Sequence, residues 1–212
     1  MMTRFLLLLI LSLSVGSVSF AESANTKLPL LLQFTDDPAR AMHLPLLREV
    51  GSDFAQRELR IWIGFGVVKP ESLARFVIDQ NGNLSTESYL YYGVDWKDDP
   101  EKEFRDLYED MISDCTVIGV YGKDEACRLK KLDKNLYRKV FKKIEALGVW
   151  TLPDGNDVST YEDELVVSDG IAMVIEVRDG PFYRAYSWSN PGFRKAPEAI
   201  RASKILAEVS KL

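Results

Sequence analysis

The sequence predicts an α+β fold, in which an antiparallel sheet of about five to six strands is built from hairpins and packed by three main helices. Three observations support this class. Stretches with the two-residue period of strands occur in pairs around turn signals. Stripes with helical spacing are segregated between those pairs, and most strand connections are short enough to be hairpins. We expect the helices to cover one face of the sheet.

The clearest hairpin spans residues 171–191, IAMVIEVRDGPFYRAYSWSNP. A two-residue Asp179-Gly180 turn is disfavoured because Pro181 lacks the N–H that would close it. A four-residue loop, Asp179 to Phe182, avoids this conflict and keeps the apolar side chains on one face. The predicted pairs are Val177 with Arg184, Ile175 with Tyr186, and Met173 with Trp188.

The remaining elements follow from the same two periods. A meander is expected from strands at 58–68, 73–80 and 84–92, with Asn81-Gly82 as its second turn, and a short strand at 116–121. Helices are expected from Asp98 or Asp99 to Ile112, at 134–147, and from about Pro197. The last helix should bury Ile200, Val209 and either Ile205 or Leu206.

The N-terminus has the pattern of an export signal. Arg4 precedes an apolar run, Phe5 to Leu13, and Ser19-Phe20-Ala21 fits a peptidase site with cleavage before Glu22. The alternative is a retained N-terminal anchor. We therefore divide the chain into a signal peptide (1–21), an N-terminal extension (22–57) and an α+β domain (58–212).

The extension contains mixed signals. Residues 28–34 are apolar and favour an edge strand or an extended segment on the core, although Pro29 lies near their start. Asp36-Asp37-Pro38 is typical of a helix start. Because Pro45 interrupts the pattern that follows, we expect one or two short helical pieces here.

The charge balance is acidic, with 27 Lys and Arg against 32 Asp and Glu and a formal net charge of −5. This balance argues against nucleic acid and against anionic lipid as partners. The helix at 134–147 has a basic outer face, which is interpreted as a solvated face. Its members are Lys134, Arg138, Lys139, Lys142 and Lys143.

Cys115 and Cys127 are the two cysteines of the chain. In an exported protein such a pair predicts a disulfide, which on the chain-entropy model stabilises the fold by roughly 3 kcal/mol. A metal site is not expected, because the thiols lack local partner ligands and the single histidine is distant in sequence. No CxxC redox motif occurs.

No catalytic motif is present. The chain lacks GxSxG, SxxK, P-loop, dinucleotide-binding and HExxH patterns, so no cofactor is expected. His43 has no adjacent nucleophile or orienting carboxylate. The acidic loop from Asp154 to Glu164 fails the calcium-loop pattern, because Leu165 stands where the twelfth position requires glutamate. We assign no catalytic and no metal-binding residue.

Aromatic side chains on the strands are the candidate binding residues. They are Trp62, Tyr89, Tyr91 and Tyr183, to which Arg184 is added because it interrupts an otherwise apolar hairpin face. Tyr89 and Tyr91 share a face with Glu87 and are expected to point outward. The alternative is that the aromatic residues fill the core, and that Arg184 extends its charged end to the sheet edge.

Three stretches carry a resemblance to a known group of proteins. These are Tyr183 to Pro191 (YRAYSWSNP), Arg60 to Gly66 (RIWIGFG) and the Asn81-Gly82 hairpin. Over residues 58 to 205 the chain resembles small, functionally uncharacterised exported proteins of Gram-negative bacteria. The resemblance implies a periplasmic or extracellular location and transfers no catalytic residue.

Two functional classes follow. The absence of catalytic signatures favours a non-catalytic binding or inhibitor-like module, with an envelope protein or a glycan as its partner and no membrane span after signal cleavage. The alternative is a hydrolase of envelope polymers that uses dispersed carboxylates. An exposed aromatic patch would favour the first class. A cleft holding two carboxyl groups roughly 5–10 Å apart would favour the second.

The disulfide leads to a direct prediction. Reduction should increase the intact mass of the protein by two hydrogens, and an alkylating reagent should modify Cys115 and Cys127 only after that reduction. Mass spectrometry with and without reductant measures both effects. Alkylation of the unreduced protein at either cysteine would contradict the prediction.

Overall fold

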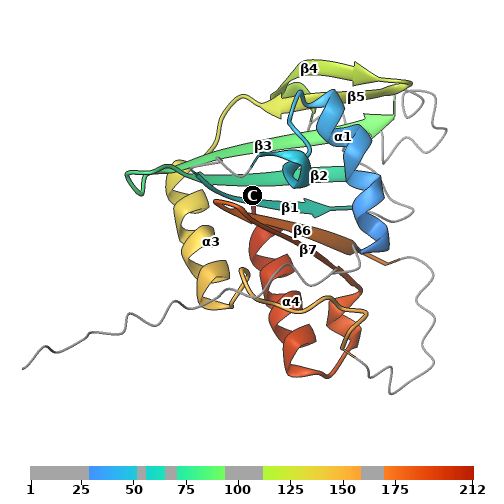
Figure 1. Ribbon diagram of the computed structural model, residues 1–212. Coiled ribbons are helices and arrows are strands. Elements are labelled where there is room, and N and C mark those ends of the chain that lie inside the picture. The colour runs from blue at the N-terminus through green and yellow to red at the C-terminus, as the bar shows by residue number, and fades with distance from the viewer. Residues whose placement is uncertain (1–28, 52–55, 65–70, 94–111, 159–169) are drawn as a thin grey trace, which may run out of the picture.

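The computed structural model describes residues 29–51, 56–64, 71–93, 112–158 and 170–212. It contains one antiparallel sheet whose seven strands lie in the order β4-β5-β3-β2-β1-β6-β7 (Figure 1). The interior strand β1 pairs with β2 on one side and with β6, which lies far along the chain, on the other. The strands are β1 Arg57–Ile63, β2 Glu71–Ile78, β3 Leu84–Gly93, β4 Cys115–Tyr121, β5 Asp124–Leu129, β6 Ala172–Asp179 and β7 Phe182–Ser189.

The predicted α+β class is confirmed, with one strand more than the expected range. The additional strand is β5. Its short sequence, DEACRL, contains three charged residues and does not show the two-residue alternation of apolar and polar side chains that predicts a strand. The α-helices of the described residues are α1 Asp36–Ala41, α3 Lys134–Ala146 and α4 Pro197–Val209. Three 3-10 turns accompany them: η1 Leu30–Thr35, η2 Leu47–Glu49 and η4 Pro191–Phe193. The helix expected before Ile112 falls almost wholly on residues 94–111, outside the described residues.

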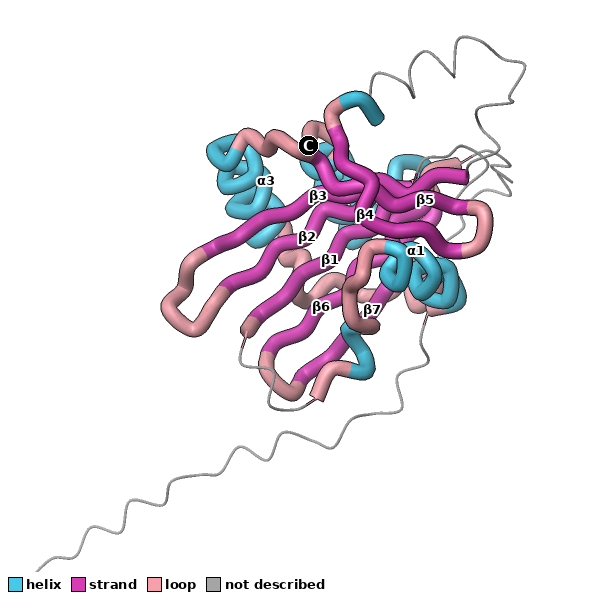
Figure 2. Tube along the Cα trace, turned by 90° about the horizontal axis from the view of Figure 1, so that it is seen from above, coloured by secondary structure: helices cyan, strands magenta, loops and turns pink. Residues whose placement is uncertain are grey.

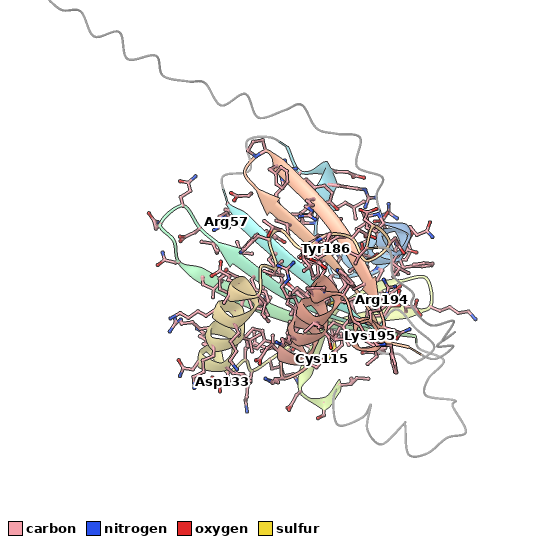
Figure 3. The ribbon with its side chains drawn as sticks, turned by 90° about the horizontal axis from the view of Figure 1, so that it is seen from below. Arg57, Cys115, Asp133, Tyr186, Arg194 and Lys195 are labelled. Atoms are coloured by element: carbon pink, nitrogen blue, oxygen red, sulfur yellow. A yellow bond between two sulfur atoms is a disulfide. The ribbon has the colours of Figure 1, made fainter. Side chains whose placement is uncertain are left out.

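Helices α3 and α4 pack side by side on one face of the sheet (Figure 3). Phe76 meets Phe141 of α3 with ring centroids 5.3 Å apart, and both lie in the main hydrophobic core. The prediction that Ile200 is buried is wrong, because 46 % of this residue is exposed. The buried stripe of α4 instead runs through residues 199, 202, 205 and 209, which recur at helical spacing.

The N-terminal segment, residues 29–51, covers the opposite face, with α1 against β4 and β5 and η2 against β6 and β7 (Figure 2). The expectation that helices cover only one face is therefore wrong. The expected extended structure at 28–34 is also wrong where it is described. Pro29 caps the 3-10 turn η1, which begins at Leu30, and the Thr35 hydroxyl donates to the carbonyl oxygen of Leu32 (2.8 Å). The helix start at Asp36 is confirmed.

The register of the 171–191 hairpin is confirmed at all three predicted pairs. The strands continue further than expected, so that Asp179 pairs with Phe182 and the turn contains only Gly180 and Pro181. Gly180 adopts a φ of 53°, which glycine tolerates without a Cβ penalty. The longer strands keep an even loop length and therefore leave every side chain on its predicted face.

The predicted disulfide is present between Cys115 on β4 and Cys127 on β5. The two Cα atoms lie 5.6 Å apart, within the usual range for a disulfide. The bond joins two adjacent antiparallel strands at one edge of the sheet, where the β4–β5 hairpin has only β3 as a further neighbour.

A close approach between Gly119 and the N-terminal segment fixes that segment against β4. A Cβ atom at Gly119 would lie 2.1 Å from the carbonyl oxygen of Ala41. The strand is irregular here, with a register shift between Val117 and Gly119. His43 Nε2 lies 2.9 Å from the carbonyl oxygen of Ile118, so that a hydrogen bond also joins the two segments.

The Gly119→Ala substitution should destabilise the protein by about 1–3 kcal/mol, because its methyl group has no space beside a backbone carbonyl. Urea unfolding of the variant measures this loss. The control is Val120→Ala, since Val120 is 61 % exposed and its truncation should change stability by less than about 0.5 kcal/mol. Equal stability of the two variants would contradict the close approach.

Candidate functional site

Four of the predicted binding residues lie on the sheet face that the N-terminal segment covers. Trp62, Tyr89 and Tyr91 are 1 %, 3 % and 4 % exposed. The expectation that Tyr89 and Tyr91 point outward is therefore wrong. Both pack in a cluster with residues 32, 39, 41 and 42 of the N-terminal segment. The binding role of these aromatic residues stays a prediction, but they form no exposed platform.

Arg184 lies on the other face of the sheet, apart from the four aromatic residues. Its guanidinium group donates to the carbonyl oxygen of Leu152 and lies 5.0 Å from the ring centroid of Tyr186. This contact is a cation–π interaction with a buried ring. The side chain thereby links Leu152 to β7. Arg184 is half-buried, as expected for an arginine that extends its charged end to the edge of the sheet.

Trp62 and Tyr183 meet at a buried carboxylate, Glu176. Trp62 Nε1 donates to Oε2 of Glu176 (2.7 Å), and the Tyr183 hydroxyl donates to Oε1 (3.1 Å). Burial raises the pKa of Glu176 above its ordinary range, although the charge of Arg60 and both hydrogen bonds oppose this shift. The two predicted aromatic residues therefore serve a buried polar network.

A row of charged residues crosses the same face, and we call Glu58, Arg60, Arg75 and Glu87 the ionic row. Arg75 donates to both carboxylate oxygens of Glu58 (2.7 and 2.9 Å), and Arg60 Nε donates to Oε1 (2.7 Å). Arg75 also pairs with Glu87. Burial raises the pKa of Glu58, but the hydrogen bonds and charges of Arg75 and Arg60 outweigh burial and hold this pKa below its usual range.

Two buried arginines connect this face to the N-terminal segment. Arg60 Nη1 donates to the carbonyl oxygen of Pro45 (2.8 Å). Arg178 Nη2 donates to the carbonyl oxygens of Val50 (2.8 Å) and Gly51 (2.9 Å). These bonds satisfy backbone acceptors of a covering loop. Arg60 and Arg178 therefore hold the N-terminal segment on this face of the sheet.

The described residues locate the remaining candidates of the sequence, which are a metal cluster, His43 and the acidic loop. They contain no group of three or more His, Cys, Asp or Glu side chains that could hold a metal ion. His43 is exposed and engaged with β4. Asp154 accepts a hydrogen bond from the backbone N–H of Ser187 (2.8 Å) through one oxygen and from that of Asn156 (2.8 Å) through the other. Asp154 thus joins its loop to the edge of β7.

The strongest candidate site lies where β3, the end of β5 and the start of α3 diverge. A pocket of about 680 Å³ opens there, within the volume range of known ligand sites. Its cationic side chains are Arg128, Lys130, Lys134 and Arg138. The described residues that line it include no carboxylate. Figure 2 shows α3 beside the strands at the end of the sheet remote from α1.

A second pocket of about 610 Å³ adjoins the first, since both are lined by Leu84 and Arg138. It adds Lys142 and one carboxylate, Glu145, which accepts a hydrogen bond from Trp150 Nε1 (3.0 Å). We call the two pockets together the basic groove. Its cationic residues on α3 are Lys134, Arg138 and Lys142.

These three charges are not neutralised by any residue that the structure describes. Lys134, Arg138 and Lys142 form no ion pair with another described residue, whereas Lys143 on the same helix pairs with Glu208 at 3.2 Å. Elsewhere in the groove, Arg128 pairs with Glu87 at 2.7 Å, and Lys130 Nζ donates to the carbonyl oxygen of Ser113 (3.0 Å). The α3 side of the groove therefore carries the unpaired positive charge.

Comparison with models of protein families, with curated proteins and with solved structures finds no match for this chain.

The ionic row predicts a pH-dependent stability. The pKa of Glu58 is lowered in the folded protein, so its contribution is present above the unfolded pKa of about 4.3 and is lost as the pH falls below it. Glu58→Gln should therefore destabilise the protein by about 3–5 kcal/mol at pH 7, because two arginines lose their buried partner. The loss should be smaller at pH 3.

Urea unfolding at the two pH values measures this difference. Glu49→Gln is the matched control, since the Glu49 side chain is 66 % exposed and lies 3.8 Å from Arg48. It should change stability by less than about 0.5 kcal/mol at either pH. A Glu58→Gln loss that is equal at both pH values would contradict the assignment of a buried, ionised Glu58.

Proposed function

We propose that the protein is an exported, non-catalytic binding protein whose basic groove holds an anionic ligand. One observation carries the proposal: four cationic side chains, and no carboxylate of the described residues, line the larger pocket. This arrangement occurs in a chain whose formal net charge is −5. Positive charge concentrated in one concave site of an acidic protein favours and steers an anionic partner.

The basic residues of α3 are placed against the preference of the helix. Lys134, Arg138 and Lys142 follow at four-residue intervals, and like charges at this spacing destabilise a helix by roughly 0.2–0.5 kcal/mol per pair. An anion in the groove would relieve this repulsion.

The groove supports binding better than hydrolysis. A hydrolase that uses two carboxylates needs a pair of acids facing each other across the substrate. The larger pocket contains no carboxylate among its described lining residues, and the smaller pocket contributes only Glu145, which is engaged by Trp150. An anionic envelope protein or an anionic glycan has the chemistry that the groove would recognise.

Export is supported by the signal-type N-terminus and by the disulfide, since such bonds persist in oxidising compartments. Among the helices of the described residues, none has the length and apolar character needed to cross a bilayer. A location in the periplasm or outside the cell therefore belongs to the same proposal.

The test uses two labelled polyanions of matched charge, a decamer of glutamate and a decamer of galacturonate. Both should bind the wild-type protein at low ionic strength, and their affinity should fall as salt is added. Arg138→Glu reverses the charge shared by both pockets and should weaken binding roughly tenfold or more. Fluorescence anisotropy measures each affinity.

Lys139→Glu is the matched control. Lys139 is an exposed neighbour on the same helix that lines neither pocket, and its reversal changes the net charge by the same amount. Its affinity should stay within about twofold of the wild type. No binding of either polyanion, or equal effects of the two variants, would overturn the proposed function.

A further inference from the structure

One half of β3 has an open edge within the basic groove. Strand β5 pairs with β3 only over residues 89–93, whereas β2 pairs with β3 along residues 84–91. On the β5 side, Leu84 to Ser88 therefore have no partner strand among the described residues. Beyond Leu129 the chain leaves the sheet toward α3, and the larger pocket opens in the space that a longer β5 would fill.

The direction of the free backbone groups follows from the hairpin. Asp79 N–H donates to the carbonyl oxygen of Asn83 (3.1 Å), which identifies these two residues as a hydrogen-bonded pair. Antiparallel pairs alternate between bonded and non-bonded types. Ser85 and Glu87 therefore bond to β2, whereas Leu84 and Thr86 direct their N–H and C=O groups toward the groove. Ser88 has the same direction, but it lies next to the Tyr89–Arg128 pair and borders β5. This is the donor–acceptor pattern that an added strand requires.

Cationic side chains lie on both sides of this edge. Arg128 shares the face of Glu87, its ion-pair partner. Lys134 and Arg138 belong to α3, which packs on the opposite face. Successive side chains of a strand point to opposite faces, so every second side chain of a strand placed here would point toward the unpaired cations of α3. On the other face Arg128 is already paired with Glu87. Acidic residues would therefore be matched at alternate positions, on the α3 face.

From these observations we infer that the ligand of the basic groove is an extended acidic polypeptide segment, which adds as a strand to the edge of β3 at Leu84 to Ser88. This inference rests on the proposed function and specifies its ligand. An anionic glycan would meet the same cations. However, a glycan lacks the repeating amide donors and carbonyl acceptors that match the free groups of residues 84 and 86.

Thr86 offers a selective test, because its N–H faces the groove and is not used by β2. Proline is tolerated at such an edge position, yet it removes the donor that an added strand needs. Thr86→Pro should weaken binding of the glutamate decamer roughly tenfold, the effect of one or two backbone hydrogen bonds. Thr86→Ala keeps the N–H and should bind within about twofold of the wild type.

The galacturonate decamer distinguishes strand addition from charge alone. Its binding should be unchanged in Thr86→Pro, because it uses only the cations. If the glutamate decamer also binds Thr86→Pro as it binds the wild type, strand addition is overturned while the anion-binding function stands. If wild-type protein binds the galacturonate decamer alone, the ligand is a glycan, and the inference is likewise overturned. If neither decamer binds the wild type, both the inference and the proposed function fail.

A second measurement covers the case in which Thr86→Pro does not fold, which circular dichroism would show. Wild-type protein is titrated with a glutamate decamer that is N-methylated at alternate residues, in either of the two frames. This ligand keeps every carboxylate but loses the backbone donors of one edge. At least one frame should bind roughly tenfold more weakly than the unmodified peptide. Equal binding of both frames would overturn strand addition.

Discussion

The ion pairs of Glu58 with Arg60 and Arg75 are the interactions that connect the sheet to the N-terminal segment. The Glu58 carboxylate accepts hydrogen bonds from Arg60 and Arg75, and Arg60 in turn bonds to the carbonyl oxygen of Pro45. A buried ion pair contributes little net stability compared with apolar packing. Its effect here is positional. Glu58 fixes the guanidinium group of Arg60, and this group donates a hydrogen bond to the N-terminal segment on the face opposite α3 and α4.

The helix-covered half of the fold could be predicted from the sequence. Alternation over 171–191, together with an even loop length, determines the hairpin register, since a slip by one residue would expose the apolar stripe. The same reasoning fails on the opposite face. Glu58, Arg60 and Glu176 alternate with apolar residues as they would in a solvent-exposed face, although all three are at most 2 % exposed. Only the covering segment reveals that they are buried.

Tyr89 and Tyr91 illustrate the same limit at the level of a site. Their position beside Glu87 suggested solvent, because a carboxylate is usually exposed. The structure gives Glu87 two arginine partners, Arg75 and Arg128, and a hydrogen bond from the Tyr89 hydroxyl (2.8 Å). The arginines come from β2 and β5, so they cannot be recognised from the sequence around Glu87. The polarity of Glu87 therefore does not show that Tyr89 and Tyr91 are exposed.

The basic groove could be predicted only in part. The spacing of Lys134, Arg138 and Lys142 is visible in the sequence and indicates one side of a helix. A groove forms beside this part of the helix because β5 ends at Leu129, whereas β3 extends further in the same direction, as far as its first residue, Leu84. The groove is thus a consequence of unequal strand lengths, and β5 was itself missed because charged residues interrupt its short pattern.

The bonds from Arg178 to the N-terminal segment also set an order of assembly during biosynthesis. Arg178 is 128 residues later in the chain than Val50, whose carbonyl oxygen it binds. The ribosome releases the N-terminal segment first, but these hydrogen bonds cannot form until β6, which carries Arg178 and pairs with β1, has been synthesised. The N-terminal segment is therefore synthesised well before the strand that binds its last residues, and these bonds are long-range contacts of the kind that slow folding.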